Sequence, residues 1–272
     1  MQIGRWQPET IQSFVNFLEP NRAVKALILV GSNAKASIDS WSDVDLVCVI
    51  KDTELAQFFP GIEWLAAFGE TIGLEQSSTP FKSVTRLCFD DFRRVDLVFI
   101  PENALALPET WNYASDETQV LFARSALVDS TLHSRSITMS VTPAFDSQQF
   151  ERLAQQFWFK AATAIAKVMR NDLLIGLHLA LDLARDCLVL GMIARDLEMG
   201  TTKHPHGGPY NELVDRIGIG NSRPTAQGIL ELILHAAVTF DALALRLSPT
   251  YNARIGVLRD WIALAQNILT SS

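Results

Sequence analysis

Cysteine is scarce in this chain of 272 residues, and internal repeats and low-complexity segments are missing. The three cysteines, Cys48, Cys88 and Cys187, all lie in apolar runs, and their spacing does not match that of zinc ligands. An odd number of cysteines without such spacing argues against a disulfide framework and is typical of a reducing compartment. We therefore expect a cytoplasmic protein.

Secretion signals and membrane spans are not expected either. The sequence begins MQIGRWQPETIQSF, without the basic stretch and following apolar stretch of a signal peptide. The most tempting candidate for a membrane span, residues 173–197, contains Asp182, Arg185 and Asp186 in its middle. Charges are costly in lipid, so we predict a buried helix at this position.

Positive charge is scarce in the first half of the chain. The net charge is −7, and residues 1–149 contain 19 acidic residues but only 11 Lys and Arg, whereas residues 150–272 contain 11 and 12. An acidic half attracts cations and repels a phosphate backbone. Because there is also no basic stripe, nucleic acid is an unfavourable partner.

The hydrophobic pattern changes once along the chain. Apolar residues with helical spacing predict a helix over 8–20, and short β-rich apolar runs then predict strands. The predicted strands are 24–30, 45–50, two within 83–100 around a turn at Asp90-Asp91, and 119–129. Helical periodicity returns later and predicts helices at about 147–170, 173–199, 225–247 and 252–270. The expected fold class is α+β: a mixed β-sheet domain with flanking helices over 1–140, followed by an all-α helical bundle over 141–272.

Two acidic residues stand where the second predicted strand begins, in the segment GSNAKASIDSWSDVDLVCVI (31–50). Residues two apart in a strand point to the same face, so Asp43 and Asp45 repel each other unless a cation lies between them. Mg²⁺ suits such a pair because it binds carboxylate oxygens and still leaves sites for phosphate. An Asp-x-Asp pair can also serve only as a turn cap, so the pair alone does not decide the function.

Two further features favour a site over a turn cap. Gly31-Ser32 follows the preceding strand, and glycine lets the backbone of a tight turn approach a phosphate closely. Asp96 lies between Val95 and Leu97 in a predicted central strand, where a lone carboxylate is costly unless it is paired or bound to metal.

Gly31-Ser32, the ten intervening residues, Asp43-Val44-Asp45-Leu46 and the strand-borne Asp96 together resemble the motif of the nucleotidyltransferase superfamily with the DNA polymerase β-like fold. With a helical second domain, the chain is most similar to the aminoglycoside and lincosamide nucleotidyltransferases. The resemblance covers residues 24–100.

This resemblance implies a transfer of AMP from ATP to a hydroxyl group of a small acceptor, such as an aminoglycoside antibiotic, with release of pyrophosphate. Asp43, Asp45 and Asp96 would be the catalytic residues and would hold two Mg²⁺ ions. Gly31 and Ser32 would bind the phosphates, and Asp96 would also accept the proton of the hydroxyl. The helical domain would supply the rest of the acceptor pocket.

The helical half offers four candidate binding residues. Lys160 lies in an apolar aromatic segment and either snorkels to the surface or contacts a phosphate. Asp182 and Asp186, with Arg185 on the same helix face, form either an internal ion-pair cluster or the wall of an acceptor cleft. Lys203 lies in a loop, residues 199–213, from which it could reach a triphosphate. His204 and His206 in the same loop lack acidic or cysteine partners at zinc-like spacing.

Two other functions stay open. The acceptor could be a protein or RNA, or the chain could bind nucleotide without turnover. Ala36 supports the last alternative, because relatives often carry glycine there and alanine would be strained in a turn of positive φ.

Overall fold

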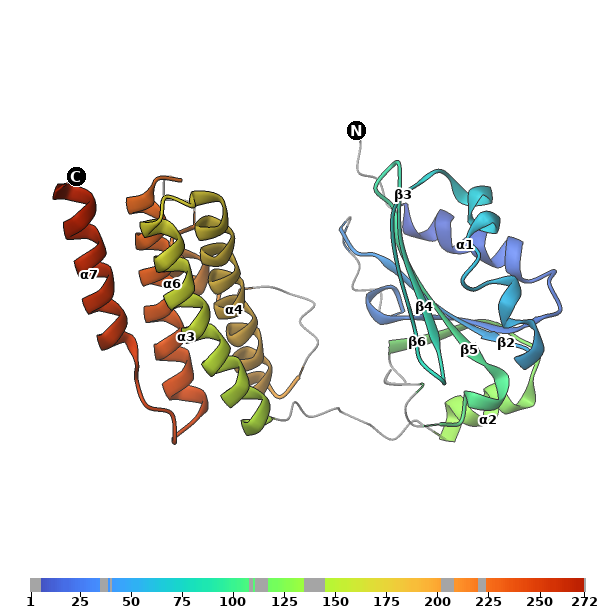
Figure 1. Cartoon of the computed structure of the whole chain (residues 1–272). Coiled ribbons are helices and arrows are strands. Elements are labelled where there is room, and N and C mark those ends of the chain that lie inside the picture. Colours follow the sequence, from blue (N-terminus) through green and yellow to red (C-terminus); the bar gives the residue numbers. More distant parts are fainter. Residues whose placement is uncertain are drawn as a thin grey trace. The chain divides into compact units, whose positions relative to one another are not determined.

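The computed structural model describes residues 6–34, 39, 41–107, 110, 117–134, 145–201, 208–219 and 224–271. Its contacts divide the chain into two compact units, Met1–Ser140 and Val141–Ser272. They are called here the sheet unit and the helical unit (Figure 1).

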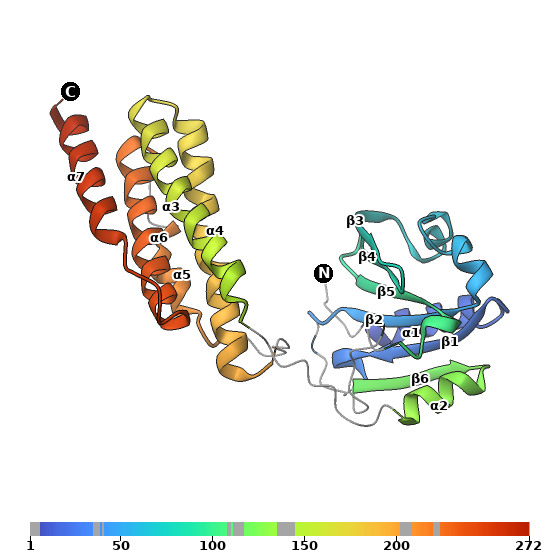
Figure 2. The same ribbon diagram turned by 60° about the horizontal axis from the view of Figure 1, so that its bottom comes forward.

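Six strands form one mixed sheet in the order β3-β4-β5-β2-β1-β6 (Figure 2). The strands are β1 (Val24–Val30), β2 (Val44–Ile50), β3 (Thr71–Ser78), β4 (Ser83–Phe89), β5 (Arg94–Pro101) and β6 (Thr118–Ala123). β2 and β5 run parallel, and the other neighbouring pairs of this sheet are antiparallel. The prediction of a mixed sheet is confirmed.

Both faces of the central strands are covered, which explains their nearly continuous apolar sequence. On one face, Leu46 of β2 belongs to the same buried cluster as Phe14 of α1 (Gln7–Leu18). On the other face, Val47 of β2 clusters with Val128 of α2 (Ala126–Ser134). Side chains alternate along a strand, so Asp45 lies on the α2 face, at the start of β2.

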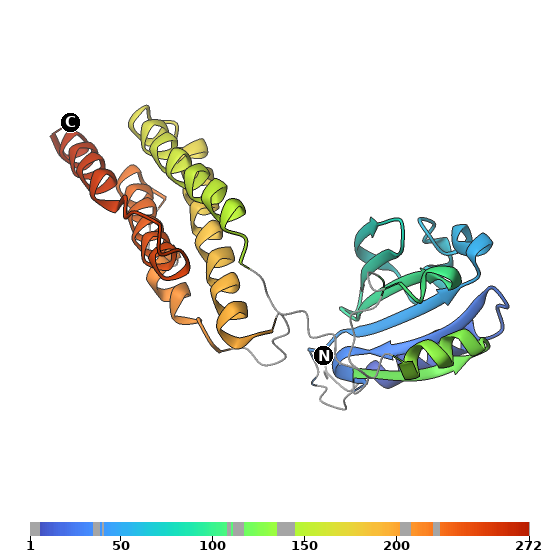
Figure 3. The same ribbon diagram turned by 90° about the horizontal axis from the view of Figure 1, so that it is seen from below.

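The helical unit consists of α3 (Ser147–Met169), α4 (Leu173–Met199), α5 (Glu212–Ile217), α6 (Ala226–Leu247) and α7 (Ile255–Ser271) (Figure 3). Side-chain caps fix where three of them begin. Asp146, Asp172 and Thr225 each accept a hydrogen bond from a backbone N–H in the first turn of α3, α4 and α6. Gly200, with φ +65°, ends α4.

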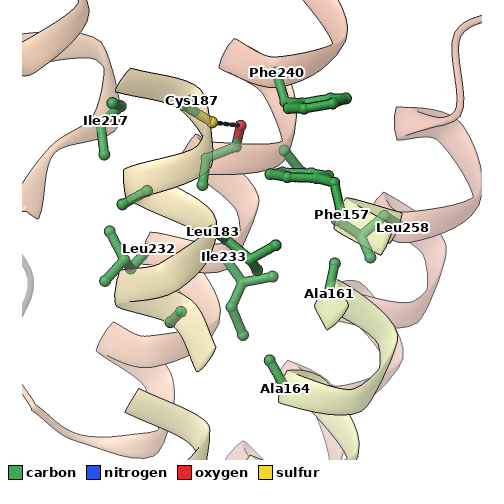
Figure 4. Close-up of a cluster of buried hydrophobic side chains, with 14 of the residues drawn as sticks. Phe157, Ala161, Ala164, Leu183, Cys187, Ile217, Leu232, Ile233, Phe240 and Leu258 are labelled. Carbon is green, nitrogen blue, oxygen red and sulfur yellow. Dashed lines mark hydrogen bonds between the residues drawn. The ribbon is translucent and has the colours of Figure 1, made fainter. Parts of the chain in front are cut away.

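The core of the helical unit lies between α3, α4 and α6 (Figure 4). The ring of Phe157 stacks on that of Phe240, with centroids 3.8 Å apart. The thiol of Cys187 donates a hydrogen bond to the carbonyl oxygen of Ala236 at 3.0 Å. α6 is long and apolar enough to cross a membrane. However, 67% of its apolar 18-residue stretch is buried inside the unit, and the core helix of a soluble protein has the same properties.

The structure differs from the sequence prediction in the segment 119–129. β6 ends at Ala123, and α2 begins at Ala126. The chain turns between them, where the Ser125 hydroxyl donates a hydrogen bond to the Glu102 carboxylate at 2.5 Å. The predicted strand was therefore too long, because its apolar residues 126–128 belong to a helix.

Candidate active site

The turn after β1 brings the backbone close to the acidic residues. Gly31 has φ +74°, and a Cβ atom added to it would lie only 2.8 Å from Oδ2 of Asp45. Glycine is thus required here for both the backbone conformation and the close approach of the carboxylate. The Asn33 side chain donates a hydrogen bond to the backbone oxygen of Asp43 at 2.5 Å. The Gly31–Asn33 turn and the start of β2 are therefore held together.

Strand register places Asp45 and Asp96 side by side. Antiparallel pairing of β1 and β2 sets Val30 opposite Asp45, and parallel pairing of β2 and β5 sets Asp45 beside Asp96. Residues paired across neighbouring strands point to the same face, so both carboxylates lie on the α2 face of the sheet. Asp43, two residues before Asp45, is half-buried on the same side.

The electrostatics of this cluster indicate a shortage of positive charge. Burial, together with repulsion from Asp43 and Asp96, raises the pKa of Asp45 to about 7, although Arg86 and Arg94 oppose this shift. Burial also raises the pKa of Asp96, although the nearby Arg86 guanidinium opposes this shift. A cation placed among these carboxylates would favour their ionised forms.

The sequence analysis missed a basic residue that contacts this cluster. Nε of Arg86 on β4 donates to Oδ2 of Asp96 at 3.0 Å, and Nη1 of Arg86 lies 3.4 Å from Oε2 of Glu75 on β3. The register sets Glu75 opposite Arg86 and Arg86 opposite Asp96. A row of charged side chains thus continues across β3, β4, β5 and β2.

An open pocket of about 530 Å³ lies beside this row. Among the described residues, its charged lining includes Asp43, Glu75, Arg86, Arg94 and Asp96. Arg94 at the start of β5 also donates a hydrogen bond to the backbone oxygen of Trp41. The pocket therefore presents carboxylates and guanidinium groups together.

The donor set fits Mg²⁺ in chemistry, since carboxylate oxygens are its preferred protein ligands. Burial, and after it repulsion from Asp43 and Asp96, raises the pKa of Asp45, and a bound cation would offset both effects. Within the described parts of the chain, no three acidic, histidine or cysteine side chains converge as a ready metal site. Asp96 points to Arg86 instead. Arg86 engages Oδ2 of Asp96, so a metal ion would share this carboxylate with the guanidinium or bind through Oδ1.

The candidates of the helical unit meet one another. Nζ of Lys160 on α3 lies 2.8 Å from Oδ2 of Asp186 on α4 and also contacts the Asp182 carboxylate. Burial disfavours the charged form of Lys160, but its hydrogen bonds to these two carboxylates raise its pKa overall. Arg185 lies 3.9 Å from each of the same two residues. The structure thus contains the ion-pair cluster that was one of the two interpretations of this helix face.

Two predicted features cannot be placed. Lys203, together with His204 and His206, lies outside the described residues, and so does Ala36.

A Gly-Ser turn against an Asp-x-Asp pair, with a third acid in register on the neighbouring strand and a helical unit following, defines the class of protein as a nucleotidyltransferase. The sequence profile of the streptomycin adenylyltransferase family matches residues 5–202. The chain belongs to this family. The match covers the sheet unit from residue 5 onward, together with α3 and α4.

Two solved structures are similar to the chain at low identity. The first is an aminoglycoside 6-adenyltransferase from Bacillus subtilis, with 13% identity, coverage of 97% of this chain and 99% of that chain, and a TM-score of 0.40. The second is a nucleotidyltransferase-like protein from Exiguobacterium sibiricum, with 12% identity, coverage of 86% and 74%, and a TM-score of 0.34. No curated protein matches the sequence. The classification therefore rests on the family match and on the site.

Proposed function

We propose that this chain is a Mg²⁺-dependent adenylyltransferase that transfers AMP from ATP to a hydroxyl group of an aminoglycoside-type antibiotic and releases pyrophosphate. It would act in the cytoplasm on a small acceptor and confer antibiotic resistance. The observation that carries the proposal is the close approach of Gly31 to Asp45, with Asp96 in register beside it. Membership of the streptomycin adenylyltransferase family supports it.

The residues of the site would divide the work as follows. Ser32 and the N–H groups of the Gly31–Asn33 turn would bind the phosphates, because Gly31 has no side chain to keep them away. Asp43, Asp45 and Asp96 would hold two Mg²⁺ ions. When bound, these ions stabilise the charge on the entering and leaving oxygens.

Asp96 would also take the proton of the attacking hydroxyl. Its raised pKa favours this role, because a carboxylate is a better base when burial disfavours its charged form. Arg86 occupies Oδ2 of this carboxylate, so the proton or the metal ion would be accepted by Oδ1 or in competition with the guanidinium.

The acidic first half of the chain suits a polycationic acceptor, which it would attract by long-range electrostatics. In the helical unit, Lys160 and Lys203 stay predicted nucleotide contacts, and Asp182 and Asp186 stay predicted acceptor contacts. For three of them, a role in binding requires that the ion pairs between Lys160 and the two carboxylates open or rearrange.

Pyrophosphate release tests the proposal. The full-length chain is assayed with ATP, with and without Mg²⁺, against streptomycin, other aminoglycosides, a lincosamide and a protein acceptor. An aminoglycoside should give Mg²⁺-dependent release, and kcat/KM should fall with salt, since the Debye length shrinks from about 10 Å at 0.1 M to about 3 Å at 1 M. Asp45→Asn should lose this release. Asp90→Asn makes the same chemical change in the hairpin loop outside the pocket, so it serves as the control variant and should keep the release.

The other outcomes separate the alternatives. Release with a lincosamide or a protein but with no aminoglycoside contradicts the cationic acceptor and leaves nucleotidyl transfer standing. Binding of ATP without release for any acceptor indicates a nucleotide-binding protein without turnover.

A further inference from the structure

The order of the strands gives the site two sides. The Gly31–Asn33 turn follows β1. Next to β1 in the sheet lies β2, which carries Asp45, and next to β2 lies β5, which carries Asp96. Beyond β5 come β4, with Arg86, and the edge strand β3, with Glu75. Figure 2 shows this order across the sheet. With strands spaced about 4.8 Å apart, the row from β1 to β3 is about 19 Å long. That length accommodates a triphosphate on one side of the acids and an acceptor on the other.

The geometry of in-line transfer decides which side of the acids holds the leaving phosphates and which side the attacking hydroxyl approaches from. The hydroxyl oxygen forms a bond to the α-phosphorus while the bond from this phosphorus to the bridging oxygen breaks, and the two oxygens lie on opposite sides of it. Pyrophosphate leaves with that electron pair, and the hydroxyl proton passes to the Asp96 carboxylate. If the turn after β1 holds the leaving phosphates, the attacking hydroxyl approaches from the side of β5, β4 and β3.

The pocket of about 530 Å³ lies on that approach side. Asp43 and Asp96 of the acid cluster line it, and so do Glu75 and Arg86. The Glu75 side chain is 71% exposed and that of Arg86 is 56% exposed, so both can meet a ligand in solution. By contrast, the Asp186 side chain in the helical unit is 9% exposed and its charge is engaged by Lys160.

We infer that this pocket is the acceptor subsite of the sheet unit, and that Glu75 and Arg86 set its preference for acceptors that carry ammonium groups. The inference rests on the proposed function and adds the place and the charges that recognise the acceptor. Glu75 attracts an ammonium group, whereas Arg86 repels it and competes with it for the Glu75 and Asp96 carboxylates. The two residues therefore act with opposite sign on the same ligand.

Binding of streptomycin to the full-length chain tests this opposition. The dissociation constant is measured by calorimetry for the unmodified chain, Glu75→Gln and Arg86→Gln. Glu75→Gln should weaken binding about fivefold, the scale of one solvent-exposed charge pair, and Arg86→Gln should tighten it about fivefold. Glu75→Lys should weaken it further than Glu75→Gln.

Glu70→Gln is the matched control, because Glu70 is exposed just before β3 and lies outside the pocket. It makes the same change in net charge and should alter binding less than about twofold, as expected for a remote, screened charge. KM for ATP should stay unchanged in Glu75→Gln, since the nucleotide binds on the other side of the acids.

Three outcomes overturn the inference. The first is a change in the streptomycin dissociation constant that is no larger in Glu75→Gln than in Glu70→Gln. The second is a change of the same sign in Glu75→Gln and Arg86→Gln, and the third is a rise in KM for ATP in Glu75→Gln without a change in streptomycin binding. In each case pyrophosphate release by the unmodified chain with streptomycin leaves the proposed function standing. If the unmodified chain releases none with any acceptor, the proposed function fails, and the binding constants still decide whether streptomycin occupies this pocket.

Discussion

Replacing Gly31 by alanine should damage the site without unfolding the protein. The new Cβ would lie 2.8 Å from Oδ2 of Asp45, whereas ordinary van der Waals contact begins at 3.4 Å, so the carboxylate must move by about 0.6 Å. The left-handed backbone of residue 31 adds about 1–2 kcal/mol of strain. Since a displacement of about 1 Å in a catalytic group can cost 10²-fold, we expect kcat to fall about 10- to 100-fold.

Gly200→Ala is the control that separates strain from displacement. Gly200 has φ +65°, close to the +74° of Gly31, but no atom lies within 4 Å of the position of its Cβ. Backbone strain should lower the free energy of unfolding of both variants by about 1–2 kcal/mol, measured by urea denaturation, and Gly31→Ala should lose somewhat more because its Cβ also meets Asp45. Only Gly31→Ala should lose pyrophosphate release. Equal activity of Gly31→Ala and the unmodified chain would refute the reasoning that this glycine makes room for Asp45.

Three further substitutions test the roles of individual charges. Asp45→Asn should abolish Mg²⁺-dependent turnover, by at least about 10²-fold, in a folded chain. The pKa of Asp45 is raised from 3.8 to about 7, so its ionisation makes the metal-free protein less stable as pH rises through that window. Asp45→Asn should remove that part of the decline, and Mg²⁺ at pH 8 should raise Tm of the unmodified chain but not of the variant. Asp96→Asn should still bind nucleotide, whereas its kcat should collapse. If nucleotide affinity and kcat fall equally, Asp96 maintains the structure of the site and does not act as the base. Lys160→Met leaves the largely buried Asp186 without its closest cation and should cost about 2–4 kcal/mol of stability; a raised KM for ATP with unchanged stability would instead favour a nucleotide contact.

The elements with strong local signals could be predicted from the sequence. β1 covers residues 24–30 as expected, because its run of apolar β-branched and leucine residues is bounded by turns. α3, α4 and α6 begin within one residue of the starts predicted from the helical periodicity of their apolar residues. β3 was missed because it is an edge strand with mostly exposed side chains and no apolar alternation.

The contacts of Asp96 could not be predicted, because they depend on the register of the β4–β5 hairpin. This register differs by one residue from the one that the predicted turn implies. A two-residue loop at Asp90-Asp91 would set Thr85 opposite Asp96. The loop instead includes Phe92, whose φ is +65°, and the Phe89 N–H donates to the Arg93 carbonyl oxygen at 2.9 Å. This extra residue sets Arg86 opposite Asp96. A shift of one residue moves every side chain of a strand to the other face. The positive φ of Phe92, which the sequence does not reveal, therefore decides that Arg86 contacts Asp96.

The parallel pairing of β2 and β5 also has a consequence for folding. The β3-β4-β5 meander is made of local hairpins, but β2 reaches β5 only after the intervening segment 51–93 has closed as a loop. Loop closure costs entropy before the pairing contributes stability, which makes such long-range contacts slow to form. Asp45 and Asp96 therefore come together only when this pairing forms. Recovery of activity during refolding should accordingly lag behind the formation of secondary structure, and the chain would become catalytically competent only at the end of folding.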